Sequence, residues 1–187
     1  MEIQLILFSA FIAISVAIKT EADYFYNVNR PLIIASRGAS GLLPENTLPA
    51  LKLAVTMKAD FISTQVVMTK DEKFIIHHDP GLDRVTDCDT VFPNRKTSQT
   101  VVEIGEKIYD DFVKEFTFEE IQKLRVHTDP LEVYNTRVYD GKFGVPVLTD
   151  LIETIIAMNK ERRKLNPEST VTGIMIDAKY PNFFGAM

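Results

Sequence analysis

Three side chains that can do acid–base or ionic chemistry stand where predicted β-strands end. Arg37 and His78 each follow or close a short apolar run, and Asp177 lies near the end of a third. A histidine exchanges a proton near neutral pH, a carboxylate binds hard cations, and a guanidinium holds an anion through two hydrogen bonds. The carboxyl ends of barrel strands meet on one face, so the sequence predicts that these three side chains share a site there.

The elements that position these residues alternate between strands and helices. The apolar run Leu32–Ala35 predicts a buried strand of a parallel sheet, because it is continuous and rich in β-branched residues. Three further strands are predicted at residues 61–68, 74–78 and 171–179. This order predicts an α/β fold with mainly parallel strands.

Two longer helices are predicted between the strands. Thr47 caps the first, which runs to about Lys58 and buries a stripe of Leu48, Leu51 and Val55. Thr149 is expected to cap the second, which runs to about Leu165 and ends at Asn166-Pro167.

Residues 80–143 are predicted to form an insertion, because turn residues are frequent and periodic apolar sequence is scarce. A short helix is predicted at 118–124, where Thr117 and Glu120 have the spacing of a capping box. Cys88 is expected to be a lone loop thiol, and His127 an exposed histidine.

Composition and charge exclude some partners. The net charge is -5 and basic residues are scattered, so we expect no nucleic-acid partner; the cluster at 160–164 is interpreted as a solvated helix end. The apolar residues 3–18 predict a signal peptide over residues 1–22, with an uncleaved anchor as the alternative. We therefore expect a chain that is secreted or delivered to a vacuole or lysosome, without a stable membrane span after cleavage.

Six blocks in fixed order carry a family resemblance. They are Ser36–Gly41, Pro44–Ala50, Ala59–Ile62, Met68–Asp71, His78–Pro80 and Leu82–Asp87. In order and spacing they resemble the glycerophosphodiester phosphodiesterase family, and most its bacterial-periplasmic-type branch. The resemblance extends from about Pro31 to the C-terminus.

The resemblance implies a (β/α)₈ barrel of the TIM type, of which residues 31–187 supply the N-terminal part with about four of eight strands. It implies hydrolysis of glycerophosphodiesters, such as glycerophosphocholine, to an alcohol and glycerol 3-phosphate. A divalent cation, Mg²⁺ or Ca²⁺, and two histidines serve this chemistry in the family, and an arginine holds the phosphate. It therefore implies catalytic roles for Arg37 and for His78, the latter in proton transfer. It also implies substrate binding by Arg37, Glu45 and Lys179, and a metal ligand at Asp177.

The sequence departs from the family pattern at three positions. Ser36 replaces the first histidine, and Ser63 and Gln65 replace the carboxylates that bind the cation. Serine and glutamine offer only neutral oxygens, and serine does not shuttle protons near neutral pH. Asp177 keeps a carboxylate where the family has a longer glutamate. We therefore expect impaired turnover, with a catalytically inactive secreted binding protein for phosphodiesters or lipid head groups as the alternative.

Each retained residue also has a structural alternative. Arg37 can pair with a neighbouring carboxylate, Glu45 can favour the positive end of the following helix, and Asp177 can form an ion pair with Lys179. His77 is expected to be structural. An open half-barrel also leaves sheet edges exposed, which allows self-association.

Overall fold

The computed structural model describes residues 29–131 and 136–185. Ile33–Met187 form one compact unit. The predicted signal peptide lies outside the described residues. Within the described ranges, none of the helices combines the length and the apolar composition that a membrane span requires.

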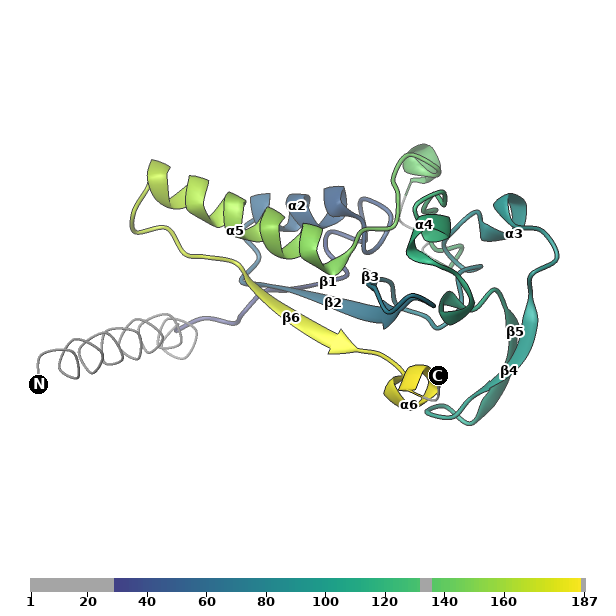
Figure 1. The fold of residues 1–187 in the computed structure, drawn as a ribbon. Helices are drawn as coiled ribbons and strands as arrows, with labels where there is room; N and C mark the ends of the chain where they lie inside the picture. Colours follow the sequence, from purple (N-terminus) through teal and green to yellow (C-terminus); the bar gives the residue numbers. More distant parts are fainter. Residues whose placement is uncertain (1–28, 132–135, 186–187) are drawn as a thin grey trace, which may run out of the picture. The chain divides into compact units, whose positions relative to one another are not determined.

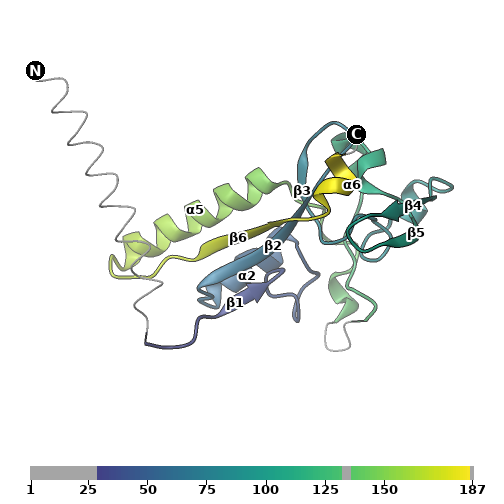
Figure 2. The ribbon, with the colours of Figure 1, turned by 90° about the horizontal axis from the view of Figure 1, so that it is seen from below.

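A four-stranded sheet organises this unit (Figures 1 and 2). The strands β1 (Ile34–Ser36) and β6 (Gly173–Ala178) lie on either side of β2 (Phe61–Met68), and both run parallel to it. The fourth strand, β3 (Phe74–Ile76), is antiparallel to β2. The predicted strand at 74–78 is therefore confirmed over Phe74–Ile76, but the expectation that it runs parallel to the others is wrong. The short turn at 69–73 explains the difference, because only an antiparallel hairpin can be closed by so few residues.

The two outer parallel strands are more exposed than predicted. Ile34 in β1 is 48% exposed and Ile176 in β6 is 46% exposed, so the expectation of a buried first strand is wrong. Each of these strands pairs with β2 alone among the described strands, so one backbone edge is left open. Self-association through these edges stays a prediction.

Two helices cover one face of the sheet side by side (Figure 1). Helix α2 (Leu48–Thr56) begins at Thr47, whose hydroxyl accepts a hydrogen bond from the Ala50 amide, as predicted. Helix α5 (Leu148–Leu165) begins after Val147, so the predicted Thr149 cap is wrong because that threonine already lies in the helix. Both helices contribute to a core shared with the sheet, which comprises Leu51, Ala54, Val55, Ala59, Ile62, Ile76, Leu151 and Ile155.

The segment between β3 and α5 builds a second hydrophobic core together with Val67 of β2 and Ile75 of β3, which its weak periodicity did not predict. It contains α3 (Cys88–Val91), β4 (Thr97–Val101), β5 (Glu106–Asp110), α4 (Phe118–Ile121) and the 3₁₀ turns η1 (Val113–Glu115) and η2 (Arg137–Tyr139). Helix α6 (Pro181–Gly185) adds two phenylalanines to this core, whose other members include Leu82, Val101, Phe112, Phe116, Ile121 and Leu124.

Smaller predictions in this segment have mixed outcomes. The capping box of Thr117 and Glu120 is confirmed, with both reciprocal hydrogen bonds formed. Cys88 is not a loop thiol: it opens α3 and is fully buried, because apolar neighbours surround it. His127 is half-buried rather than exposed.

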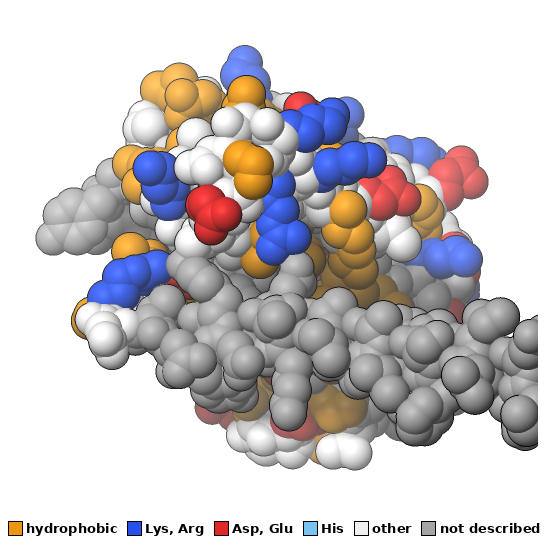
Figure 3. Space-filling view, turned by 90° about the vertical axis from the view of Figure 1, so that its left-hand side faces the viewer, with side chains coloured by type: hydrophobic (Ala, Val, Ile, Leu, Met, Phe, Trp, Pro, Cys, Tyr) orange, Lys and Arg blue, Asp and Glu red, His pale blue; other side chains and the backbone are white. Residues whose placement is uncertain are grey.

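The basic cluster at the end of α5 lies at the surface, where Lys160, Arg163 and Lys164 line one shallow hollow. Lys164 pairs with Glu161 at 2.6 Å. Arg162 turns inward and donates to backbone carbonyls, including that of Val55. Figure 3 shows basic, acidic and hydrophobic side chains interspersed on this face. The absence of a nucleic-acid partner stays a prediction.

Candidate functional site

The turn after β1 sets the direction of Arg37. Arg37 and Gly38 both adopt positive φ, 58° and 81°. A Cβ atom at Gly38 would lie 2.7 Å from the carbonyl carbon of Ala50, so only glycine fits there. The Arg37 amide donates to the Ser63 carbonyl at 2.7 Å, which places this residue beside the middle of β2.

His78 reaches the same level of the sheet from the opposite direction. The antiparallel register pairs Ile76 with Val66, and the His77 amide continues it by donating to the Gln65 carbonyl at 3.1 Å. Residue 78 therefore arrives beside the end of β1, although β3 is not a parallel strand. His78 is bonded through Nδ1 to the Asp79 carboxylate at 2.6 Å.

His77 is structural, as predicted. It is buried, and its Nε2 lies 2.8 Å from the Gly81 carbonyl oxygen. Burial lowers the pKa of His77, which keeps its ring neutral near pH 7.

Two arginines converge on one buried carboxylate. Arg37 Nη1 donates to Glu45 Oε2 at 2.6 Å, and Arg84 Nη2 donates to Glu45 Oε1 at 2.7 Å. Arg84 also pairs with Asp79 and Asp129. We call these five residues the arginine–carboxylate cluster. The alternative that Arg37 pairs with a carboxylate is thus realised, and Glu45 joins two arginines besides lying near the start of α2.

The charges in the arginine–carboxylate cluster stabilise one another. Burial alone would raise the pKa of Asp79, but hydrogen bonds from His78 and Arg84 hold that pKa well below its usual range. Burial would lower the pKa of Arg84, yet its bonds to Glu45 and Asp79 raise it further above its usual value. Both groups are therefore ionised at neutral pH.

The pH dependence of folding is expected to report on Asp79. A carboxylate with a lowered pKa contributes stability above its unfolded pKa, about 3.8, and loses it as the pH falls. Asp79→Asn should lower the free energy of unfolding by roughly 2 kcal/mol at pH 7 and by roughly half as much at pH 2.5, where the carboxylate is still ionised in the folded protein. Urea unfolding at both pH values measures this. The exposed Asp150→Asn is the matched control, and an equal loss at both pH values would contradict the expectation.

The predicted metal positions do not fit a divalent cation. Gln65 and Asp177 are register partners on β2 and β6, so they lie side by side as expected. Gln65 Oε1 accepts a hydrogen bond from Asn46 Nδ2 at 3.3 Å, and Asp177 pairs with Lys179 at 3.1 Å. Ser63 adds only a hydroxyl. One carboxylate that already has an ammonium partner falls short of the anionic oxygen set that Mg²⁺ or Ca²⁺ prefers.

Lys179 lies outside the arginine–carboxylate cluster, to which the other predicted substrate ligands, Arg37 and Glu45, belong. Among the described residues, no ion pair or side-chain hydrogen bond joins Lys179 or Asp177 to the arginine–carboxylate cluster. Charges of both groups act on the phenol of Tyr180, namely those of Asp79 and Arg84 and those of Asp177 and Lys179. Burial is the main cause of its raised pKa, and its φ of 54° marks a turn at the end of β6.

Three site residues were not predicted from the sequence. Arg84 stands in the block Leu82–Asp87 that carried the resemblance, yet no role was assigned to it. Asp129 lies 45 residues further along the chain, and Tyr180 follows β6. A signal for Arg84 was present, since an arginine inside a motif block usually faces anions.

This α/β fold gathers arginines, a histidine and carboxylates around the ends of β1 and β3, which defines a class of site whose groups can bind an anion. The chain belongs to the Glycerophosphoryl diester phosphodiesterase family, whose sequence profile matches residues 37–180. The family predicted from the six blocks is therefore confirmed.

Relatives and solved structures agree with this assignment. The chain is 33% identical over 157 residues to glycerophosphodiester phosphodiesterase GDPD6 of Arabidopsis thaliana, covering 83% of this chain and 38% of that protein. It is 33% identical over 142 residues to the enzyme of Haemophilus influenzae, covering 71% and 36%. The chain thus spans less than half the length of these relatives.

The fold is shared with solved structures of phosphodiesterases. The glycerophosphodiester phosphodiesterase of Agrobacterium tumefaciens matches with a TM-score of 0.53 and 23% identity, over 84% of this chain and 52% of that one. A phosphodiesterase of Oleispira antarctica, solved with the product sn-glycerol-3-phosphate, matches with a TM-score of 0.51 and 21% identity, over 79% and 45%.

Proposed function

We propose that this chain is a glycerophosphodiester phosphodiesterase-type hydrolase whose own turnover is strongly reduced. Its substrates would be glycerophosphodiesters such as glycerophosphocholine, cleaved to an alcohol and glycerol 3-phosphate. The observation that carries the proposal is the convergence of Arg37 and His78 at the end of β1. Family membership and the product bound to the Oleispira antarctica relative support the substrate class.

We also propose that the four-stranded sheet is part of a (β/α)₈ barrel. Two parallel strands flank β2 and two helices cover one face, as in a barrel wall. The two solved structures that share the fold extend over about twice the matched length.

Arg37 is the residue proposed to hold the phosphate. Its guanidinium carries five N–H donors, of which Nη1 is engaged by Glu45, and its side chain is about a quarter exposed, at 26%. A partly exposed guanidinium with spare donors can bind a phosphate oxygen pair. His78 stands ready as a single proton donor or acceptor, because Asp79 orients its ring.

The reduced turnover is inferred from Ser36, Ser63 and Gln65. Loss of one general acid or base costs about 10²–10⁴ in rate. The register pairs Ser36 with Ser63, so both substitutions fall in one row of the sheet. This grouping favours the second candidate function, a catalytically inactive protein that binds phosphodiesters or lipid head groups.

Binding and turnover of the full 187-residue chain separate these candidates. We expect calorimetry to detect binding of sn-glycerol 3-phosphate to the unaltered chain. The variant Arg37→Met should bind it at least about tenfold more weakly. The exposed Arg125→Met is the matched control. Weak cation-dependent release of glycerol 3-phosphate from glycerophosphocholine would support the hydrolase, and binding without release would support the inactive relative. Absence of both binding and release would contradict both.

We further propose that residues 1–22 act as a signal peptide and direct the chain into the secretory pathway. The apolar composition of residues 3–18 supports this. N-terminal sequencing of the mature protein, starting near Asp23, would test it, and a sequence that starts at Met1 would contradict it.

A further inference from the structure

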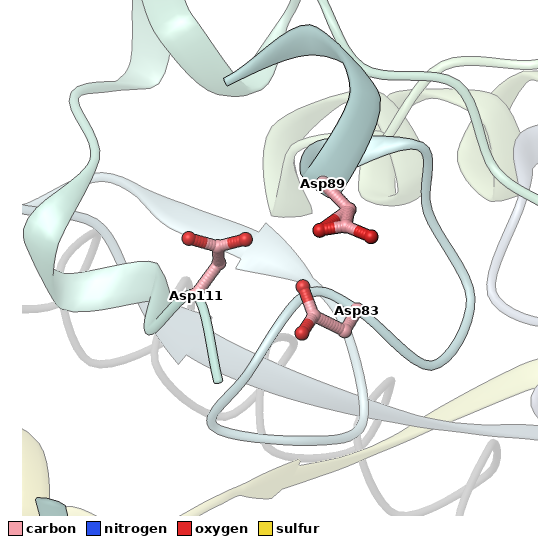
Figure 4. Close-up of side chains that lie close together, drawn as sticks. All are labelled: Asp83, Asp89 and Asp111. Atoms are coloured by element: carbon pink, nitrogen blue, oxygen red, sulfur yellow. The ribbon is translucent and has the colours of Figure 1, made fainter. Parts of the chain in front are cut away.

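Three aspartates from separate segments meet outside the site described above (Figure 4). Asp83 lies in the loop after β3, Asp89 in α3, and Asp111 directly after β5. One carboxylate oxygen from each residue lies within 4.8 Å of the others. We call these residues the aspartate triad.

A fourth aspartate holds the backbone of the triad in place. Asp110 Oδ1 accepts hydrogen bonds from the amides of Leu82, Asp83 and Asp111, at 3.0, 3.1 and 2.7 Å. Its carboxylate covers Gly81, where a Cβ atom would lie 2.1 Å from Asp110 Cγ. The segments that carry Asp83 and Asp111 are therefore fastened together whether or not the triad binds anything.

The inner part of the triad has unsatisfied oxygens. Asp111 is 1% exposed, and neither of its carboxylate oxygens accepts a hydrogen bond from any residue in the described ranges. Asp83 Oδ1 is likewise buried without a partner there. Buried carboxylates are normally paired, hydrogen-bonded or bound to a metal. In Figure 4 the three carboxylates point toward one another, so these oxygens face a common point.

The charge of the triad is only partly compensated. Lys96 Nζ pairs with Asp83 Oδ2 at 2.8 Å and with Asp89 Oδ1 at 3.0 Å. Three carboxylates against one ammonium leave two negative charges. Lys96 engages the outer oxygens, whereas the buried oxygens of Asp111 and Asp83 Oδ1 stay available. One divalent cation would neutralise the remainder.

We propose that the aspartate triad binds one hard divalent cation, with Ca²⁺ as the best-fitting ion. Carboxylate oxygens are the ligands that Ca²⁺ and Mg²⁺ prefer, and Ca²⁺ tolerates irregular geometry because its coordination is flexible. Water would complete the shell on the side of Asp89, whose side chain is 66% exposed. The triad thus offers what Ser63 and Gln65 lack, namely several anionic oxygens around one point.

The cation would act as a structural clamp on the loop that carries Arg84. Asp83 immediately precedes Arg84, and Arg84 supplies three ion pairs to the arginine–carboxylate cluster. A cation bound to Asp83 and Asp111 would add side-chain bonds to the backbone bonds through which Asp110 already joins this loop to the end of β5. The inference does not depend on the proposed function, because it concerns folding and loop order.

Thermal unfolding of the full-length chain tests the clamp. The protein is freed of metals with EDTA, dialysed, and titrated with CaCl₂. Binding to the folded state alone raises Tm, and we expect a rise of about 5–10 °C at a Ca²⁺ concentration near 100 times Kd. Calorimetry should give one Ca²⁺ per chain. Absence of both a Tm rise and binding heat with Ca²⁺ and with Mg²⁺ would overturn the proposal.

Variants locate the cation. Asp111→Asn should raise Tm in EDTA, because a buried charge is removed, and should abolish the rise with Ca²⁺. Asp89→Asn changes an exposed side chain, which keeps folding intact, and should weaken Ca²⁺ binding by about tenfold. Asp150→Asn and Asp177→Asn should retain the full rise. A Ca²⁺ response that survives both Asp111→Asn and Asp89→Asn, or one that is lost in Asp177→Asn alone, would overturn the assignment.

Discussion

Replacing Arg84 by methionine is expected to lower the free energy of unfolding by about 3–5 kcal/mol, because it leaves buried carboxylates without their shared cation. Glu45 is only 5% exposed, and Asp79 and Asp129 face the same guanidinium. Methionine keeps the apolar stem of the side chain but supplies no charge. Urea unfolding at pH 7, followed by circular dichroism, measures the difference.

Arg125→Met is the matched control for this experiment. Arg125 is exposed, and its guanidinium donates only to the backbone carbonyls of Gln122 and Leu124 among the described residues. Its replacement should change stability by about 0.5 kcal/mol or less. A loss of less than 1 kcal/mol for Arg84→Met would show that solvent screens the cluster and that Arg84 does not organise the site.

The parts of the fold that depend on local signals could be predicted from the sequence. The cap at Thr47, the capping box at Thr117 and Glu120, and the strand Phe61–Met68 all follow from residue types within a few positions. The end of α5 at Asn166 was also predicted. These features need no knowledge of distant contacts.

The parts that depend on distant contacts could not be predicted in this way. The direction of β3 was not predicted, although the turn before it is too short to connect two parallel strands. The exposure of β1 was missed because an apolar run does not reveal whether both of its faces are covered. The core around Phe112 and Phe116 was missed because it assembles from short segments without periodicity.

The candidate site shows the same division. Arg37, Glu45 and His78 lie inside motif blocks, and the structure brings them to one level of the sheet. Their partner Arg84 needed the fold, because the bonds that define its place span 39 residues to Glu45 and 45 residues to Asp129. The aspartate triad could be found only from the fold as well. Its members lie in a loop, in a helix and after a strand, so their spacing in the sequence does not form a metal-binding motif.

Restoring three residues is expected to give the largest change in activity. The variant Ser36→His, Ser63→Glu, Gln65→Asp should raise cation-dependent release of glycerol 3-phosphate from glycerophosphocholine by at least about 10²–10⁴ over the unaltered chain. The register explains why three changes act together. Residue 36 pairs with residue 63, and residue 65 pairs with Asp177, so an imidazole and three carboxylates would face one another across adjacent strands.

The single variant Ser36→His separates proton transfer from cation binding. It should restore little, because Ser63 and Gln65 still lack the anionic oxygens that a hard cation requires. Adding Asp177→Asn to the triple variant should abolish the gain, and EDTA should do the same. Activity restored by Ser36→His alone, or equal activity in the unaltered chain, would show that the neutral side chains at 63 and 65 are no obstacle and that the reduced-turnover proposal is wrong.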